Sequence, residues 1–87
     1  MRLRLSSGHE ELSVEFPDGR PVTGAQLLRE AGEQRPDLYQ RWCDQEGRLR
    51  TSLSVFVDGE HIRYREGLET KLSEGNEVYV IPLITGG

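Results

Sequence analysis

Apolar and polar residues alternate in two short stretches near the start of this chain, residues 2–6 and residues 11–16. A period of two residues places every second side chain on the same side, so each stretch predicts a half-buried β-strand. The positions expected to face inward are Leu3, Leu5, Leu12, Val14 and Phe16. Gly8 lies between the stretches and is a typical turn residue. We therefore expect the chain to open with a β-hairpin.

The same alternation returns in the second half of the chain, in residues 52–57, 61–65 and 77–83. Asp58-Gly59 separates the first two of these stretches and is a strong signal for a two-residue hairpin turn. The positions expected to face inward are Leu53, Val55, Val57, Ile62, Tyr64, Val78 and Val80. Three further strands are therefore predicted, and the first two of them form a second hairpin.

Between the two groups of strands, the apolar spacing becomes that of a helix. The residues that share its apolar face are Leu27, Leu28 and Ala31. Thr23 precedes this stretch and Gln26 stands three residues later, which is the spacing of a capping box. Pro36 disfavours helical backbone in the residue before it, so the helix should end near residues 34–35.

Two shorter helical turns are also expected. Asp37 can cap a turn whose apolar residues are Leu38, Tyr39 and Trp42. Leu68 and Leu72 fit another turn before the last strand. The resulting order of elements is typical of an α+β domain in which one main helix lies across one face of the sheet. We expect the first and last strands to pair centrally and in parallel.

The composition fits one small soluble domain, because 87 residues provide a single modest core. The net charge is −4, from 11 basic and 15 acidic residues, and there is no basic run. Nucleic acid is therefore not expected as a partner. No apolar stretch is long enough to span a membrane or to form a signal-peptide core, so we expect a cytoplasmic protein with no membrane partner.

Side chains that carry chemistry are few. Cys43 is the one cysteine, which excludes an internal disulfide and a multi-cysteine metal site. Beside Trp42 it is more typical of core packing than of a persulfide relay. His9 and His61 lie too far apart in the sequence to indicate a metal site. No nucleophile–base spacing and no phosphate-binding glycine motif is present, so no catalytic residue, no metal and no bound cofactor is expected.

A series of short motifs runs from Leu53 to the last residue. They are Val55-Phe56-Val57-Asp58-Gly59, Ile62-Arg63, Gly67-Leu68, Leu72, Gly75, Glu77-Val78, Ile81-Pro82 and Gly86-Gly87. In these residues the chain resembles the MoaD/ThiS family of ubiquitin-like sulfur carrier proteins, most closely the cysteine-synthesis carrier and the small subunit of molybdopterin synthase. The resemblance implies a β-grasp fold, with a mixed sheet of four to five strands and one main helix packed across one face.

The resemblance also implies a mechanism centred on Gly87. A ubiquitin-activating-type enzyme, an adenylyltransferase and sulfurtransferase, would use ATP and Mg²⁺ to adenylate the carboxylate of Gly87. A persulfide sulfur would then displace AMP and leave a thiocarboxylate, which a sulfur-accepting biosynthetic enzyme uses as its donor. The chain would be a substrate of both enzymes, would catalyse nothing itself, and would be a monomer when free.

The residues support such a reaction independently of the resemblance. We divide the chain into a domain at residues 1–83 and a flexible tail at residues 84–87. The tail is Ile84, Thr85, Gly86 and Gly87. Glycine has no side chain to obstruct passage into a narrow site. Four residue steps from Leu83 reach about 14 Å when extended. Pro82 lacks an N–H and should help to free the tail from the sheet.

Strand alternation also predicts a surface for partners. If the valines of the last strands point inward, Phe56, His61, Arg63, Tyr79 and Ile81 point outward. Aromatic residues and arginine are enriched at protein interfaces. We therefore predict partner binding at Phe56, Arg63, Tyr79 and Ile81, although single exposed apolar residues are also ordinary.

Three alternatives remain open from the sequence. The chain could be a permanent small subunit, as in molybdopterin synthase. It could be a ubiquitin-like modifier conjugated through Gly87 to other proteins, although Lys71 is its single lysine. It could also be a passive interaction module. The final sulfur acceptor, in the synthesis of cysteine, a cofactor or a secondary metabolite, is left undetermined.

Overall fold

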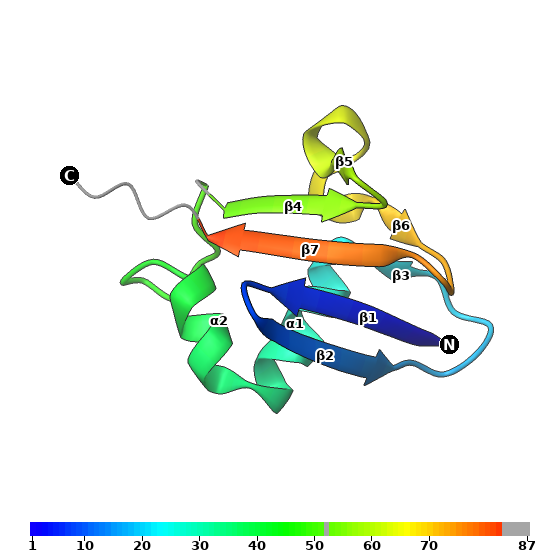
Figure 1. Ribbon diagram of the computed structural model, residues 1–87, viewed down its shortest axis with the longest axis horizontal. Helices are drawn as coiled ribbons and strands as arrows, with labels where there is room; N and C mark the ends of the chain where they lie inside the picture. The colour runs from blue at the N-terminus through cyan, green and yellow to red at the C-terminus, as the bar shows by residue number, and fades with distance from the viewer. Residues whose placement is uncertain (52, 83–87) are drawn as a thin grey trace.

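A computed structural model of the chain describes residues 1–51 and 53–82. Five strands form one mixed sheet in the order β2-β1-β7-β4-β5 (Figure 1). Their bounds are β1 Arg2–Ser7, β2 Glu10–Glu15, β4 Leu53–Val57, β5 Glu60–His61 and β7 Glu77–Pro82. Two more short strands, β3 Val22–Thr23 and β6 Lys71–Leu72, pair with each other.

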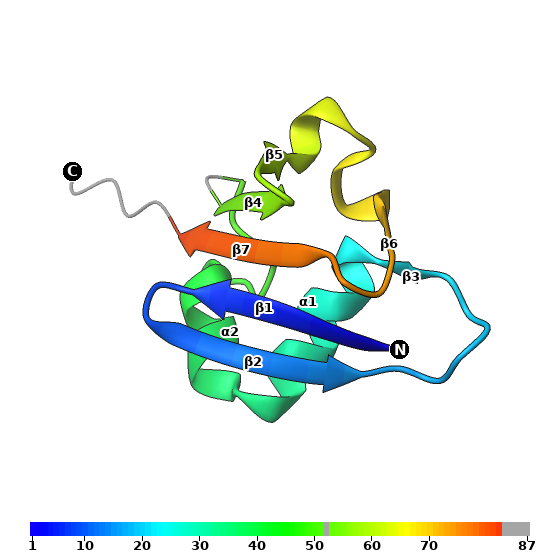
Figure 2. The same ribbon diagram turned by 45° about the vertical axis from the view of Figure 1, so that its right-hand side comes forward.

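Two helices cover one face of the sheet, and two 3₁₀ turns follow β5. Their bounds are α1 Gly24–Gln34, α2 Pro36–Trp42, η1 Ile62–Tyr64 and η2 Gly67–Glu69. Both views place α1 and α2 behind the sheet, and no described helix or strand covers its front (Figures 1 and 2). No helix in residues 1–51 or 53–82 is long and apolar enough to cross a membrane. This is the predicted α+β architecture.

The sheet has the predicted pairing at its centre. β1 pairs antiparallel with β2 and parallel with β7, with Leu5 opposite both Leu12 and Val78. β4 pairs antiparallel with the other side of β7. A parallel pair between the first and last strands needs a long crossover, which the helices provide. β7 is therefore the central strand, paired with β1 as far as Val80 and with β4 as far as Pro82.

Helix α1 begins as predicted. The Thr23 hydroxyl accepts the Gln26 backbone N–H at 3.3 Å, and the Gln26 side chain accepts the Thr23 backbone N–H at 2.9 Å. This reciprocal capping box satisfies two N–H groups that the first turn leaves without partners. The expected apolar face of Leu27, Leu28 and Ala31 is fully buried against the sheet.

The start of helix α2 differs from the expectation. Arg35 occupies the cap position and its side chain makes no cap bond, while Asp37 lies inside the first turn. The Asp37 carboxylate instead pairs with the Arg35 guanidinium at 3.0 Å, and that cation lowers the pKa of Asp37. Pro36 explains the shift, because proline favours the first helical position and so places the cap at Arg35, two residues before Asp37.

The two helices approach each other closely at Gly32. A Cβ added there would lie 2.3 Å from Cδ1 and 2.9 Å from Cβ of Tyr39. We expect Gly32→Ala to destabilise the fold, because overpacking costs about 1–3 kcal/mol and exceeds the ~1 kcal/mol gain in helix propensity. Urea unfolding measures the difference. Gly24→Ala is the matched control, because its new Cβ would have no neighbour closer than 3.5 Å; equal effects of both changes would contradict the close approach.

The segment after β5 is where the structure departs most from the predicted strands. The expected strand over residues 61–65 ends at His61, and η1 follows. Ile62 is buried as expected, but Tyr64 is 73% exposed rather than inward. Leu72 was expected in a helical turn and instead pairs in β6 opposite Val22. The expected turn survives only as η2 around Leu68.

Candidate docking face and the carboxyl end of the sheet

The predicted reactive tail, Ile84, Thr85, Gly86 and Gly87, lies outside the described residues, as does the domain boundary at residue 83. The structure does describe the strand that leads to it. β7 ends at Pro82, which stands opposite Leu53 at the start of β4. On its other side, Val80 stands opposite Ser7 at the end of β1. The chain therefore enters the tail from the centre of the sheet, at one end of it (Figure 1).

Buried contacts hold this end of the sheet. The Trp42 indole Nε1–H donates to the Ser7 hydroxyl at 3.1 Å, and both residues are buried. This bond ties the last residue of α2 to the last residue of β1. A buried indole N–H needs such a partner, because leaving it unpaired is costly. Cys43 is also buried, which agrees with the core-packing interpretation rather than with a relay. The frame around β7 is therefore fixed.

The open face of the sheet carries a patch of large side chains, which we call the outer patch: Phe56, His61, Tyr79 and Ile81. Tyr79 is 46% and Ile81 45% exposed, and both project from the central strand. Phe56 stands opposite Tyr79 and opposite His61, and its ring meets the His61 ring edge-on with centroids 5.1 Å apart. The prediction that these four side chains face outward is confirmed.

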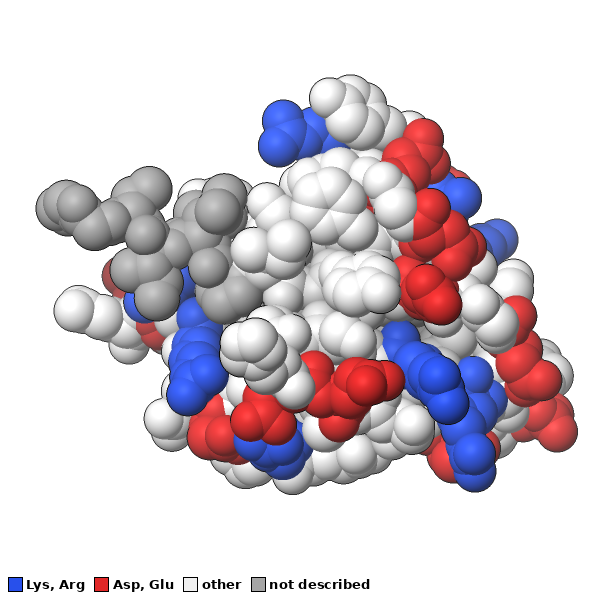
Figure 3. Space-filling model, in the orientation of Figure 1, with Lys and Arg blue, Asp and Glu red and all other residues white. Residues whose placement is uncertain are grey.

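Charged residues surround this region rather than occupying it. Figure 3 shows uncharged side chains over β7 and β4, with acidic and basic side chains towards the border. An apolar area with a polar rim is the usual composition of a protein–protein interface. The outer patch is therefore a candidate docking face, and it continues along β7 to Ile81, next to the last described residue.

Arg63 does not belong to the outer patch. It was placed there by strand alternation, but the strand ends at His61 and Arg63 lies in η1. The His61 Nδ1 accepts the Arg63 backbone N–H at 3.0 Å, which turns the chain away from the ladder. The exposed Arg63 guanidinium lies 5.9 Å from the centroid of the Tyr64 ring. Arg63 instead lines a hollow beside β4, together with Arg50, which the sequence did not single out.

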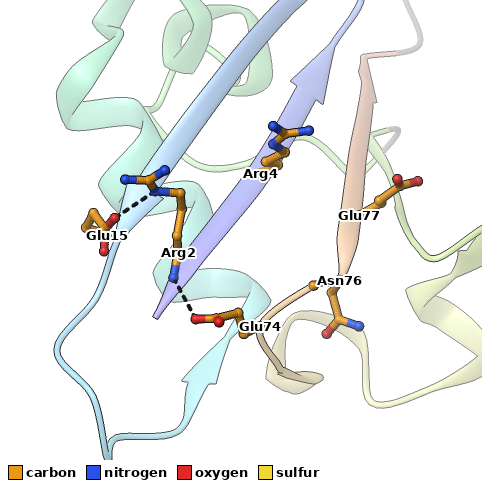
Figure 4. Close-up of a pocket in the computed structure, with 7 residues that line it drawn as sticks. Arg2, Arg4, Glu15, Glu74, Asn76 and Glu77 are labelled. Atoms are coloured by element: carbon orange, nitrogen blue, oxygen red, sulfur yellow. Dashed lines mark hydrogen bonds and ion pairs between the residues drawn. The ribbon is translucent and has the colours of Figure 1, made fainter.

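Another hollow, of about 520 Å³, lies at the opposite end of the sheet (Figure 4). Arg2 lies there between two carboxylates: its Nε contacts Glu15 at 2.7 Å and its backbone N–H contacts Glu74 at 3.4 Å. Arg2 and Glu15 are both well exposed, so this pair contributes little to stability. The hollow lies at the start of β7, far along the strand from the residues that lead to Gly87. It is therefore a poor candidate for the predicted chemistry.

No constellation for metal binding appears in the part of the chain that the structure describes: no three His, Cys, Asp or Glu side chains come together there. Tyr39 has a raised pKa, first because of burial and then because of the neighbouring Cys43. It packs edge-on against Trp42 with centroids 6.2 Å apart, which is a core contact. The chemically distinctive region is therefore the carboxyl end of β7 with the outer patch beside it.

Comparison with known proteins places these features in a family. Residues 4–87 match the ThiS family. A candidate sulfur carrier protein of Archaeoglobus fulgidus is 30% identical over 87 residues, which cover 100% of this chain and 98% of that protein. The family match begins within β1, and both alignments reach Gly87.

Solved structures share the fold. The SAMP1 protein of Haloferax volcanii superposes with a TM-score of 0.80 at 18% identity, covering 100% of both chains. The crystal structure of the BexX/CysO complex of Amycolatopsis orientalis contains a chain that matches with a TM-score of 0.62 at 24% identity, covering 86% of this chain and 80% of that one. These likenesses confirm the β-grasp fold, and with the family match they show that the chain belongs to the ThiS family of ubiquitin-like sulfur carrier proteins.

Proposed function

We propose that this protein carries sulfur as a thiocarboxylate on Gly87 and is a substrate, not an enzyme, in the reactions that load and unload it. The observation that carries the proposal is the family match through residue 87, on a fold whose central strand leads to that glycine. The described residues add a rigid frame at the carboxyl end of the sheet and an apolar docking face beside it.

The chemistry follows from the acidity of a terminal carboxyl group. Its pKa is near ~3.5, so at neutral pH it is an anion and a poor acyl donor. An activating enzyme with ATP and Mg²⁺ would transfer AMP to the Gly87 carboxylate and release pyrophosphate. A sulfur nucleophile then displaces AMP at the carbonyl carbon. The folded domain contributes binding and reach, and the activating enzyme contributes the nucleotide and the metal.

The outer patch is the surface that we assign to the activating enzyme. Ile81 precedes the last described residue, so a partner that grips Ile81 and Tyr79 holds the chain immediately before the tail. Holding both ends of a short segment reduces the entropy cost of aligning the carboxylate with the nucleotide. Arg63 faces a different hollow, so any contribution of Arg63 to binding would come from another side of the molecule.

Intact-mass spectrometry tests the proposal. The purified chain, with Gly87 as its last residue, is incubated with the activating-type enzyme of its host, ATP, Mg²⁺ and sulfide. We expect the mass to rise by the difference between one sulfur and one oxygen, and tail fragmentation to place the change on Gly87 and so exclude oxidation elsewhere. A chain that remains unchanged while the same enzyme, with ATP, loads sulfur onto another carrier would contradict the proposal.

A second candidate function is supported by the fold. The Haloferax volcanii protein with the TM-score of 0.80 is described as a small archaeal modifier protein. Conjugation of this chain to lysines would use the same adenylate at Gly87, followed by amide formation. Lys71 in β6 is exposed but is the single lysine, so self-conjugation would have one side-chain target. Covalent high-mass adducts in a host lysate would favour this function, and a stable complex with one enzyme would favour the role of a permanent subunit.

A further inference from the structure

Strand β4 has one edge that is only partly paired. Its ladder with β5 consists of Phe56 opposite His61 and Val57 opposite Glu60, and the chain then turns into η1. Residues 53–55 therefore have β7 on one side and, within the described chain, no strand on the other. Figure 1 shows β5 alongside only the last part of β4. The Leu53 N–H already donates to the Arg50 carbonyl at 3.1 Å, and the edge offers its remaining backbone N–H and C=O groups to an added strand.

A hollow of about 300 Å³ lies beside this edge, between the residues that precede β4 and the two 3₁₀ turns. We call it the edge groove. The residues that line it and are used below are Leu49, Arg50, Leu53, Ile62, Arg63 and Leu68. The surface that lines it is mainly apolar. The groove could therefore accept one or two apolar side chains from a segment that pairs with β4.

Local hydrogen bonds hold the walls of the edge groove in place. On one side, the Arg50 backbone N–H donates to the Trp42 carbonyl at 2.9 Å. On the other, the Thr70 hydroxyl donates to the Gly67 carbonyl at 2.6 Å and accepts the Glu66 backbone N–H at 3.1 Å. Thr70 is buried, so η2 is anchored to the body of the protein. A groove with fixed walls loses little entropy when it binds a ligand.

The charge of the edge groove is opposite to that of the protein. The net charge of the chain is −4, yet the described lining of the groove holds two arginines and His61 and no acidic residue. Among the ion pairs of the described residues, four other arginines have acidic partners, while Arg50 and Arg63 have none. Arg50 contributes to the lowered pKa of Asp44, although the Arg48 backbone N–H is the larger cause. Of the two arginines in the groove, Arg63 is therefore the more available to a carboxylate.

We propose that the edge groove binds an extended segment of a partner protein, which adds as a strand to residues 53–55 of β4, places apolar side chains in the groove and sets an acidic side chain against Arg63. Backbone pairing, apolar burial and charge each contribute to such binding. The inner-face residues Leu53 and Val55 line this groove, and His61 is the member of the outer patch that also lines it. Tyr79 and Ile81 do not line it, so one partner can occupy the groove while another holds these two residues. The proposal does not depend on sulfur chemistry.

Synthetic peptides test each part of the proposal on the purified chain. The probe is a fluorescein-labelled peptide of sequence Ser-Val-Thr-Ile-Asp-Glu, and fluorescence anisotropy measures its binding. We expect saturable binding, weaker by about tenfold when lysines replace the two acids and by a similar factor when alternate backbone nitrogens are methylated, because methylation removes ladder donors. Amide shifts in the ¹⁵N-labelled protein should move at Leu53, Ile62 and Leu68 and stay unchanged at Tyr79 and Ile81.

Charge reversal provides the matched variants. Arg63→Glu should lower the affinity for the acidic peptide by about tenfold or more, because the new carboxylate repels its acids. The same change should raise the affinity for the lysine peptide, because the carboxylate attracts its lysines. Arg20→Glu is the control, since Arg20 is an exposed arginine in the loop before β3 and does not line the groove. Circular dichroism verifies that both variants fold. Absence of saturable binding, indifference to N-methylation, equal effects of the two variants, or shifts centred on the outer patch would each overturn the proposal.

Discussion

Removal of Gly86 and Gly87 is expected to abolish sulfur loading while leaving the unfolding midpoint unchanged. The proposed reacting atom is the carbonyl carbon of Gly87, which the truncation removes. The truncated chain would end at Thr85, whose β-branched side chain is stiffer and wider than glycine and would fit a narrow passage less well. Every buried core residue of the described structure lies before residue 82, so the truncation removes none of them. Intact mass after incubation with the activating enzyme measures loading, and thermal unfolding measures the fold.

Thr85→Ala is the matched control for this truncation, because it alters the tail and keeps the terminal glycine pair. We expect it to retain loading within a few-fold. Sulfur acquired by the truncated chain at a site other than its new terminal carboxyl group would move the acceptor to a side chain and contradict the thiocarboxylate mechanism. The buried thiol of Cys43 makes that outcome physically unfavourable, since a loading enzyme would have to open the core to reach it.

The regular strands could be predicted from the sequence because their signal is local. In β1, β4 and β7 the buried positions are apolar except for Ser7, and each strand is long enough to show the period of two. The capping box at Thr23 is similarly local, since both partners lie within one helical turn. The parallel pairing of β1 with β7 was a fold-level expectation, and the register of Leu5 with Val78 confirms it.

The segment between β5 and β7 could not be predicted in the same way. Ile62 and Tyr64 alternate as in a strand, but two apolar positions are compatible with a 3₁₀ turn as well. The deciding contacts are side chain to backbone, above all the His61 Nδ1 that accepts the Arg63 N–H. Gly67 adopts a φ of +59°, and the spacing of apolar residues does not predict this backbone conformation. The pairing of Leu72 with Val22 joins residues fifty apart in the sequence, which alternation cannot reveal.

The residues of the candidate site also divide into those that lie in regular strands and those that do not. Phe56, Tyr79 and Ile81 lie in regular strands, so alternation placed them correctly on the open face. Arg63 lies one turn beyond the strand, so alternation placed it on the wrong surface. The edge groove was missed because it arises where a predicted strand fails to continue. A shortened β5 leaves part of β4 unpaired, and that shortening is a tertiary effect.

A charge placed in the outer patch is expected to slow loading by the activating enzyme strongly. Ile81→Asp should lower the kcat/KM of the activating enzyme for this chain by about thirtyfold, because interface hot spots contribute about 2 kcal/mol or more and each tenfold corresponds to about 1.4 kcal/mol. Ile81 is 45% exposed on the central strand, so the change places a charge in the middle of the docking face. The fold should lose no more than about 1 kcal/mol, since the position is open to solvent.

Ser13→Asp is the matched control for this charge. Ser13 is exposed in the edge strand β2, opposite Arg4, and its side chain projects from the same face of the sheet but away from the outer patch. A general electrostatic repulsion between the acidic carrier and its loader would lower both rates equally. If the enzyme contacts the outer patch, only the Ile81→Asp variant should be loaded more slowly. The change should appear chiefly in KM if docking limits loading. Equal rates for all three proteins would place the loading surface elsewhere on the molecule, because a carboxylate at the centre of a true interface cannot be buried without cost.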